Sequence, residues 1–191
     1  NSYSTNKISG NRAVGGLAGA MVWSGNLVSK SYATGDVSGD AYIGGLIGST
    51  FRGTMTDCYA TGNVTGNDYV GGLIGRQSHR TTNTCYSTGE VTGETNTAGF
   101  FGYKEWSPTS NSFWDLDTSN QIISHNWGSA QGATGKTTTE MKDFTTYSST
   151  STTGLVDPWD IVLKANHDGE ESTATWFIDD GNDYPRLWFE R

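Results

Sequence analysis

The chain reads Cys58-Tyr59-Ala60-Thr61-Gly62-Asn63-Val64-Thr65-Gly66 and, shortly afterwards, Gly71-Gly72-Leu73-Ile74-Gly75. This cassette recurs along the first 111 residues, with its leading tyrosine at Tyr3, Tyr32, Tyr59 and Tyr86 and with Phe113 in the fifth place. The gaps between these aromatic residues are 29, 27, 27 and 27 residues. A fixed period of roughly 20–50 residues is typical of a solenoid, whose units bury their apolar faces only against their neighbours.

Within a cassette, small or apolar residues alternate with polar ones, as they do from Ser31 to Ser38. A two-residue period indicates a strand with one buried face. Glycines recur at matched positions where the chain must turn between strands: Gly39, Gly66 and Gly93. The sequence therefore predicts an all-β fold, a parallel β-helix with coils of about 27 residues. We expect it to be right-handed, because parallel crossovers are.

The repeat frame also predicts which residues stack on one another. The inward columns are small or β-branched: Ser2, Ser31, Cys58 and Cys85; Ser4, Ala33, Ala60 and Ser87; Ile8, Val37, Val64 and Val91. The alternate positions of each strand are expected to face outward. They include the tyrosines and a charged column of Lys7, Asp36, Asn63 and Glu90. Leu17, Leu46, Leu73 and Phe100 form a further core column, and the side on which Ala18, Ile47, Ile74 and Phe101 lie is left open.

These cassettes resemble the GLUG motif, which is named for its Gly-Leu-x-Gly core. Three copies match well, namely 31–48, 58–75 and 85–102, while the first, at 2–19, has Asn6 where later copies have glycine. The segment from Ser112 to Met141 also resembles what commonly follows such repeats. The resemblance implies a large secreted or surface-attached microbial protein, such as a filamentous-haemagglutinin-like adhesin or the non-catalytic region of an immunoglobulin-A metalloprotease. It is specific for architecture and much less so for function.

Composition divides the chain into a solenoid of four repeats at 1–111 and an acidic, tryptophan-rich region at 112–191. Twenty of the 26 glycines precede Ser112, and five of the seven tryptophans follow Phe113. Residues 1–111 are electrically neutral, so the net charge of −8 lies in the C-terminal region. We interpret that region as a cap over the last coil, with a short helix starting at Thr137 and strands at 159–163, 175–178 and 186–189.

Composition also bounds the location and the partners. No apolar run approaches the ~20 residues of a membrane helix, so no membrane insertion is expected. A pI near 4.7 without a basic patch argues against nucleic acid binding. Few lysines and abundant Asn, Thr, Ser and Trp suit an extracellular protein. The chain starts inside a repeat at Asn1, which we interpret as a fragment or a processed form.

Two features could support a covalent bond or a metal. Cys58 and Cys85 share a column at disulfide distance, but parallel Cβ vectors strain a bridge, so buried free thiols are favoured over a disulfide. Asp179, Asp180, Asn182 and Asp183 place oxygen ligands around a glycine, as calcium loops do. They lack the spacing of a calcium loop, so an Asx-rich turn is favoured and no cofactor is expected.

Catalysis is not indicated. Asp36, Asp40, Asp57 and Asp68 are dispersed over different turns, and His79, His125 and His167 fall in unrelated contexts. The chain is therefore predicted not to be an enzyme.

The sequence favours a structural or adhesive module that presents variable turns for contact. The variable stretches are 22–30, 51–57, 76–84 and 103–111, and the candidate contact residues are Tyr32, Tyr59, Tyr86, Arg76, His79 and Arg80. For the tyrosines, packing of the rings on one another is favoured over stacking on sugars. The expected partner is a protein or glycan of a host or neighbouring cell, or a second copy at the open N-terminal coil. The alternatives are an accessory region of a larger secreted enzyme and a subunit of a surface filament.

Overall fold

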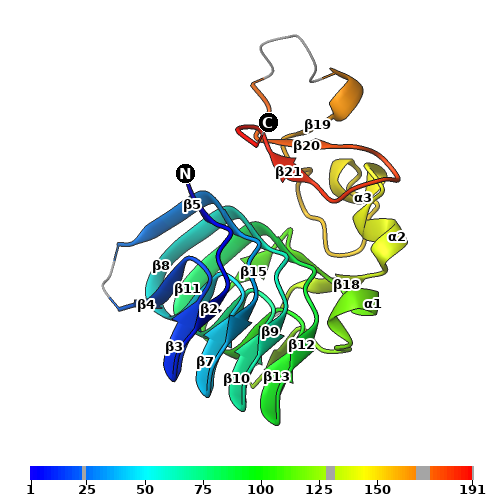
Figure 1. Cartoon of the computed structure of the whole chain (residues 1–191). Coiled ribbons are helices and arrows are strands. Elements are labelled where there is room, and N and C mark those ends of the chain that lie inside the picture. The colour runs from blue at the N-terminus through cyan, green and yellow to red at the C-terminus, as the bar shows by residue number, and fades with distance from the viewer. Residues whose placement is uncertain (23–24, 128–131, 167–172, 191) are drawn as a thin grey trace.

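A computed structural model describes residues 1–22, 25–127, 132–166 and 173–190. The chain winds into a solenoid of parallel strands that lie side by side along one axis (Figure 1). The largest sheet follows the order β1 (Ser2–Ser4), β5 (Leu27–Ala33), β8 (Ile47–Ala60), β11 (Ile74–Ser87), β14 (Phe101–Glu105) and β17 (His125–Asn126). Four further strands pair with this path: β4 (Ala18–Met21), β15 (Thr109–Ser110), β16 (Phe113–Asp115) and β18 (Thr134–Lys136).

Two smaller sheets, each of four strands, complete the coils. One contains β3 (Arg12–Gly15), β7 (Ala41–Gly44), β10 (Asp68–Gly71) and β13 (Thr95–Ala98). The other contains β2 (Ile8–Ser9), β6 (Val37–Ser38), β9 (Val64–Thr65) and β12 (Val91–Thr92). The predicted parallel β-helix is confirmed.

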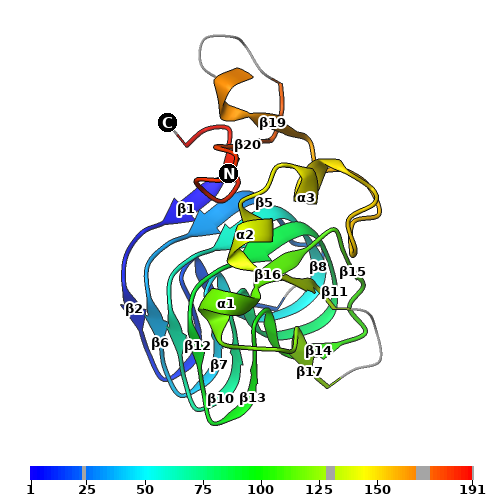
Figure 2. The same cartoon turned by 90° about the vertical axis from the view of Figure 1, so that its right-hand side faces the viewer.

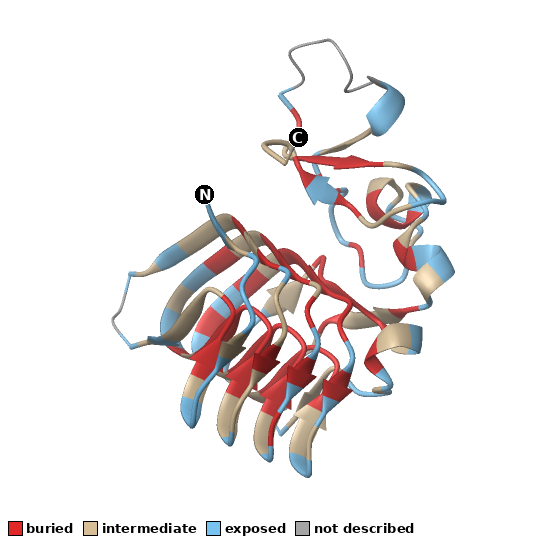
Figure 3. Ribbon diagram, in the orientation of Figure 1, coloured by how far each residue is buried: buried red, intermediate tan, exposed pale blue. Residues whose placement is uncertain are grey.

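The predicted columns are confirmed as well. Tyr32 is paired with Tyr59, Tyr59 with Tyr86, and Cys58 with Cys85, so the 27-residue frame is the pairing register. The valine column forms a separate small core, with Val37, Val64 and Val91 all buried. Figure 3 shows the buried residues lining the inside of the coils. The side that the sequence left open is now clear, because Ile47, Ile74 and Phe101 are buried with Leu46, Leu73 and Phe100 in the main core.

One glycine column marks where successive coils come closest. A Cβ on Gly62 would lie 2.0 Å from the carbonyl oxygen of Gly35, and a Cβ on Gly35 would lie 1.9 Å from that of Asn6. Gly35 and Gly62 must therefore be glycine, because any side chain there would clash with the backbone of the preceding coil.

Most corners of the coils are built by residues other than glycine. Three columns adopt positive φ: Ala13, Tyr42, Tyr69 and Asn96; Lys30, Asp57, Thr84 and Asn111; Arg52, His79 and Trp106. Left-handed backbone costs an L-residue about 1–2 kcal/mol, so the same strain is repeated at each coil. The stretches 51–57 and 76–84, which the sequence interpreted as turns, lie inside the long strands β8 and β11 and bend at these corners.

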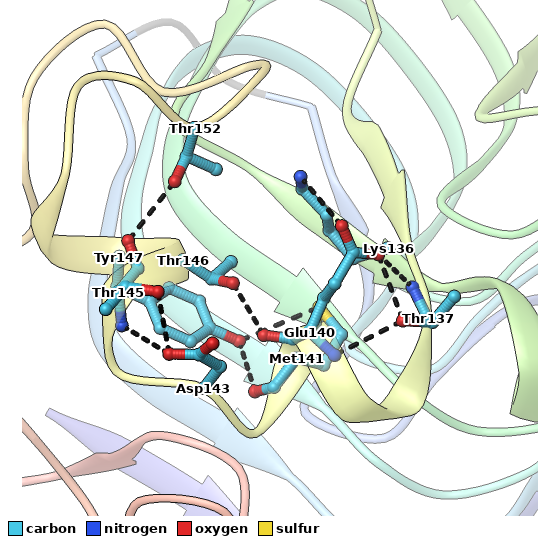
Figure 4. Close-up of polar contacts among 9 residues, drawn as sticks. All are labelled: Lys136, Thr137, Glu140, Met141, Asp143, Thr145, Thr146, Tyr147 and Thr152. Atoms are coloured by element: carbon cyan, nitrogen blue, oxygen red, sulfur yellow. Dashed lines mark hydrogen bonds and ion pairs between the residues drawn. The ribbon is translucent and has the colours of Figure 1, made fainter.

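The C-terminal region has two parts. The chain from Phe113 to Lys136 adds an incomplete fifth coil, since β16 pairs with β11 and β18 pairs with β16. The short helix α1 (Leu116–Ser119) lies within this coil, and α2 (Thr138–Met141) follows it. Thr137 caps α2 as predicted: its hydroxyl accepts from the Glu140 N–H, while the Glu140 carboxylate accepts from the Thr137 N–H (Figure 4). This reciprocal cap holds the start of the helix in place.

The remainder forms what we call the cover, the described residues 142–166 and 173–190. It contains α3 (Thr145–Ser148), β19 (Ile161–Leu163), the 3-10 helix η1 (Lys164–Asn166), β20 (Trp176–Ile178) and β21 (Arg186–Leu187). The cover lies against the flank of the solenoid that carries the tyrosines, beside the coils rather than across their end (Figure 2). The aromatic cap predicted for the last coil thus covers a side of the solenoid.

Candidate binding surface

The tyrosine column is a ladder of stacked rings. Ring centroids lie 5.2 Å apart from Tyr3 to Tyr32 and 4.9 Å apart at each of the next two steps, from Tyr32 to Tyr59 and from Tyr59 to Tyr86. The planes are within 10° of parallel, and Phe113 takes the next position in register. Aromatic stacking of this kind contributes about 0.5–1.5 kcal/mol per pair, so the ladder reinforces the pairing of successive coils.

The cover removes most of this ladder from the surface. Trp176 packs on Tyr59 and Tyr86, Trp159 packs on Tyr86 and Phe113, and all of these side chains are buried. Burial raises the pKa of the Tyr86 phenol well above its ordinary value. Only the N-terminal end of the ladder faces solvent, with Tyr3 63% exposed. Of the three tyrosines expected to contact a ligand, Tyr59 and Tyr86 are therefore covered and Tyr32 is half-buried.

Polar contacts fix the cover on the ladder. The Tyr86 hydroxyl donates to the carbonyl of Pro185 at 2.6 Å, and the Tyr59 hydroxyl donates to the carboxylate of Glu190. The Trp159 indole N–H donates to the carbonyl of Asn111 at 3.0 Å. Burial raises the pKa of the Glu190 carboxyl, and it also raises that of Asp57, which accepts from the indole of Trp176.

Arg80 lies inside the solenoid and is not available for contact. Its exposed fraction is 0%, because its position pairs with the inward residues Gly53 and Ser107 rather than with outward ones. Nη1 donates to the Thr50 hydroxyl at 2.9 Å and Nη2 to the Thr54 carbonyl at 2.6 Å, while Nε has no partner among the described residues. Burial lowers the pKa of the guanidinium. The expectation of an exposed Arg80 came from interpreting 76–84 as a turn.

His79 and Arg76 face outward, as expected. His79 occupies a corner and is exposed, with its ring 5.5 Å from that of Phe51 in an edge-on arrangement. The guanidinium of Arg76 lies 5.8 Å from the centroid of Tyr42 and 5.7 Å from that of Tyr103. Tyr42 lies on the coil before that of Arg76, and Tyr103 lies on the coil after it.

The candidate calcium turn is held by internal contacts. Asn182 and Lys164 both donate to Asp179, the Phe144 N–H donates to Asp180, and Arg186 donates to Asp183 at 2.6 Å. Each carboxylate therefore serves a different neighbour. Within the described ranges, no group of three or more His, Cys, Asp and Glu side chains could hold a metal ion.

The residues weighed for catalysis form no nucleophilic triad among the described residues. Ser78 and His79 are neighbours in sequence, and the Ser78 hydroxyl lies 2.8 Å from Nδ1 of His79 and donates to Glu105 at 3.2 Å. In a nucleophilic triad the carboxylate orients the histidine, whereas here it accepts from the serine. Asp57 lies under the cover, and His167 falls outside the described residues.

Cys58 and Cys85 are buried free thiols. Their Sγ atoms donate to the carbonyls of Thr56 and Asn83, each at 3.1 Å. Both act as small core residues.

Comparison with known families gives one match: residues 39–65 match the model of the family described as the GLUG motif. The match spans one period of the solenoid, from the glycine turn before β7 to the end of β9. The same comparison made with curated proteins and with solved structures found no match.

Proposed function

We propose that this chain, which is built from GLUG repeats, is a rigid module of a secreted or cell-surface microbial protein. Its outer faces contact the partner. The observation that carries this proposal is the regular pairing register of the central coils. From Ile74 to Ser87, β11 pairs with β8 at eleven positions, all offset by one period. Coils stacked in one register over such a length are suited to fixing a length and an orientation.

The chemistry of the interior supports a structural role. Several buried polar groups hydrogen-bond within the solenoid: Arg80 donates to Thr50 and Thr54 of the preceding coil, and Ser87 donates to the Gly99 carbonyl across its own coil. These bonds hold the coils in place and turn the groups that make them away from solvent. No helix in the described part of the chain is both long enough and apolar enough to cross a membrane.

Antibodies against the purified chain test where the module works. We expect them to label intact cells of the source organism, or to detect the chain in the culture medium. Labelling that requires permeabilised cells would contradict the proposed location. Beads coated with the chain test the adhesive part, and we expect them to bind to surfaces of host or neighbouring cells more than beads coated with the heat-unfolded chain do.

A second copy is a further candidate partner, because β1 presents an unpaired edge in this chain. Sedimentation of the chain at increasing concentration tests such end-to-end association. A concentration-independent monomer would leave contact through the outer faces as the mode of action.

A further inference from the structure

A strip of aromatic and arginine side chains runs along the axis on the outside of the solenoid, away from the cover. It consists of Arg12, Tyr42, Tyr69, Arg76, Tyr103 and Trp127, and we call it the aromatic–arginine strip. The strip lies where β3, β7 and β10 turn toward β4, β8 and β11. The strands β3, β7 and β10 lie on the side of the solenoid away from the cover in Figure 1.

The rings of the strip form one continuous row across successive coils. Centroids are 5.1 Å apart between Tyr42 and Tyr69, 5.6 Å between Tyr69 and Tyr103, and 6.0 Å between Tyr103 and Trp127. The tyrosines are half-buried and Trp127 is 72% exposed. The tyrosine ladder is covered, whereas no described segment of the chain packs over this row. A row of accessible rings along the axis matches an extended polymer rather than a compact ligand.

The two arginines add positive charge that no carboxylate of the described residues neutralises through an ion pair. Arg12 lies 4.3 Å from the centroid of Tyr42 and donates to its hydroxyl at 2.8 Å. Arg76 lies between Tyr42 and Tyr103. A guanidinium that rests on a ring keeps N–H groups at its edge free to bind a carboxylate in a bidentate manner.

Acidic side chains on the strands of the strip accept from neutral donors. Asp68 accepts from the Thr95 hydroxyl and the Asn96 amide, both at 2.7 Å, and Glu105 accepts from the Ser78 hydroxyl. These carboxylates can accept hydrogen bonds from hydroxyl groups of a ligand, and the amides beside them can donate hydrogen bonds to such groups. The strip therefore combines ring surfaces, two guanidinium groups and polar groups at its margin.

We propose that the aromatic–arginine strip binds an acidic polysaccharide, built from hexuronate units and laid along the solenoid axis. The C–H faces of pyranose rings pack on the aromatic side chains, the carboxylates pair with Arg12 and Arg76, and the hydroxyl groups meet the polar margin. This inference rests on the proposed contact function and names the class of ligand for it.

Calorimetric titration of the whole chain with oligogalacturonate tests the assignment, with the fully methyl-esterified oligomer as the neutral counterpart. We expect binding of the acidic oligomer and at least tenfold weaker binding of the ester, because esterification removes the charge that the arginines recognise. Arg76→Gln should weaken binding about tenfold. Lys7→Gln should leave the affinity unchanged. Lys7 lies away from the strip, next to the sheet that contains β2 and β6, and forms an ion pair with Asp36.

Trp127→Ala gives an independent variant that does not threaten folding, because its ring is largely exposed. We expect weaker binding with an unchanged melting temperature. Equal affinity for the acidic and esterified oligomers, equal affinity for single-stranded DNA, or full binding by Arg76→Gln and Trp127→Ala would each overturn the assignment. Absence of oligogalacturonate binding would also overturn the assignment of the ligand. The proposed function has its own tests, surface labelling by antibodies and adhesion of coated beads, so the two failures can be told apart.

Discussion

The hydroxyl of Tyr184 donates to Oδ2 of Asp115 at 2.7 Å and so joins the cover to the fifth coil across 69 residues of chain. Asp115 is buried, and it also accepts from the N–H groups of Asp117 and Thr118 and from the Thr138 hydroxyl. One carboxylate thus caps α1, contacts α2 and anchors the cover. Burial, followed by the hydrogen bond to Asp115, raises the pKa of the Tyr184 phenol above its ordinary value.

Tyr184→Phe should lower the free energy of unfolding by about 1.5 kcal/mol, since a hydrogen bond to a charged acceptor is lost while the ring stays in place. Chemical denaturation measures the change. Asp115→Asn should cost more, because all four donors then face a neutral amide. If Tyr184→Phe proved neutral, the hydrogen bond to Asp115 would contribute nothing to holding the cover in place.

Gly62→Ala should destabilise the chain by about 3 kcal/mol, because the new Cβ would meet the carbonyl of Gly35 and force two coils apart. Asn6→Ala is the matched control in the same column, where a side chain is already accommodated, and it should change stability little. Thermal unfolding distinguishes the two. Similar melting temperatures for both variants would mean that the coils separate without strain.

Thr84→Asn should stabilise the chain by about 1 kcal/mol. Thr84 holds a φ of 54°, a left-handed backbone that a β-branched residue disfavours and that asparagine adopts more easily. Thr81→Asn, on an exposed position of the same strand with ordinary backbone, should give no gain. Equal effects of the two substitutions would show that the corner carries no strain.

Lys104 should give the chain an unusual alkaline stabilisation. Burial lowers its pKa from 10.5 to about 8, so between these values the unfolded chain holds a proton that the folded chain has released. The free energy of unfolding contributed by this group therefore rises with pH, by about 1.4 kcal/mol per pH unit. It is lowest below pH 8, where the folded protein must bury the charge.

Lys104→Met tests this dependence, and methionine already occupies the same column at Met21. The variant should be the more stable form at pH 7. Its advantage over the natural chain should shrink by about 2 kcal/mol between pH 8 and 9.5, as measured by denaturant unfolding at each pH. Parallel pH profiles would mean that Lys104 titrates normally.

The sequence predicted the fold because the cassette specifies two things at once. Alternation fixed which side chains of the Cys58 and Val64 columns face inward, and the 27-residue period fixed what stacks on what. The corners were not predicted, because Tyr42 or Thr84 in left-handed backbone contradicts the usual preference for glycine there. The flank position of the cover was not predicted either, because it depends on contacts such as that of Tyr86 with Pro185, 99 residues away.

The candidate contact residues were predicted in part. The alternation of side chains along each strand placed the tyrosine ladder outside the coils, but it could not show that another part of the chain packs on the ladder. Arg80 was misplaced because a long polar stretch was interpreted as a turn, whereas β11 continues through it with alternating sides. The aromatic–arginine strip left a signal that was not used: Tyr42 and Tyr69, like Arg76 and Tyr103, are 27 residues apart.

The flank position of the cover has a consequence for how such a chain can change in length. The cover contacts Asp57, Tyr59, Tyr86 and Asn111, and Phe189 reaches back to Tyr32. A duplicated cassette inserted before Ser31 would therefore lengthen the solenoid by one coil and leave the contacts of the cover unchanged. The number of coils can therefore change by recombination without changing the residues that hold the cover on the solenoid.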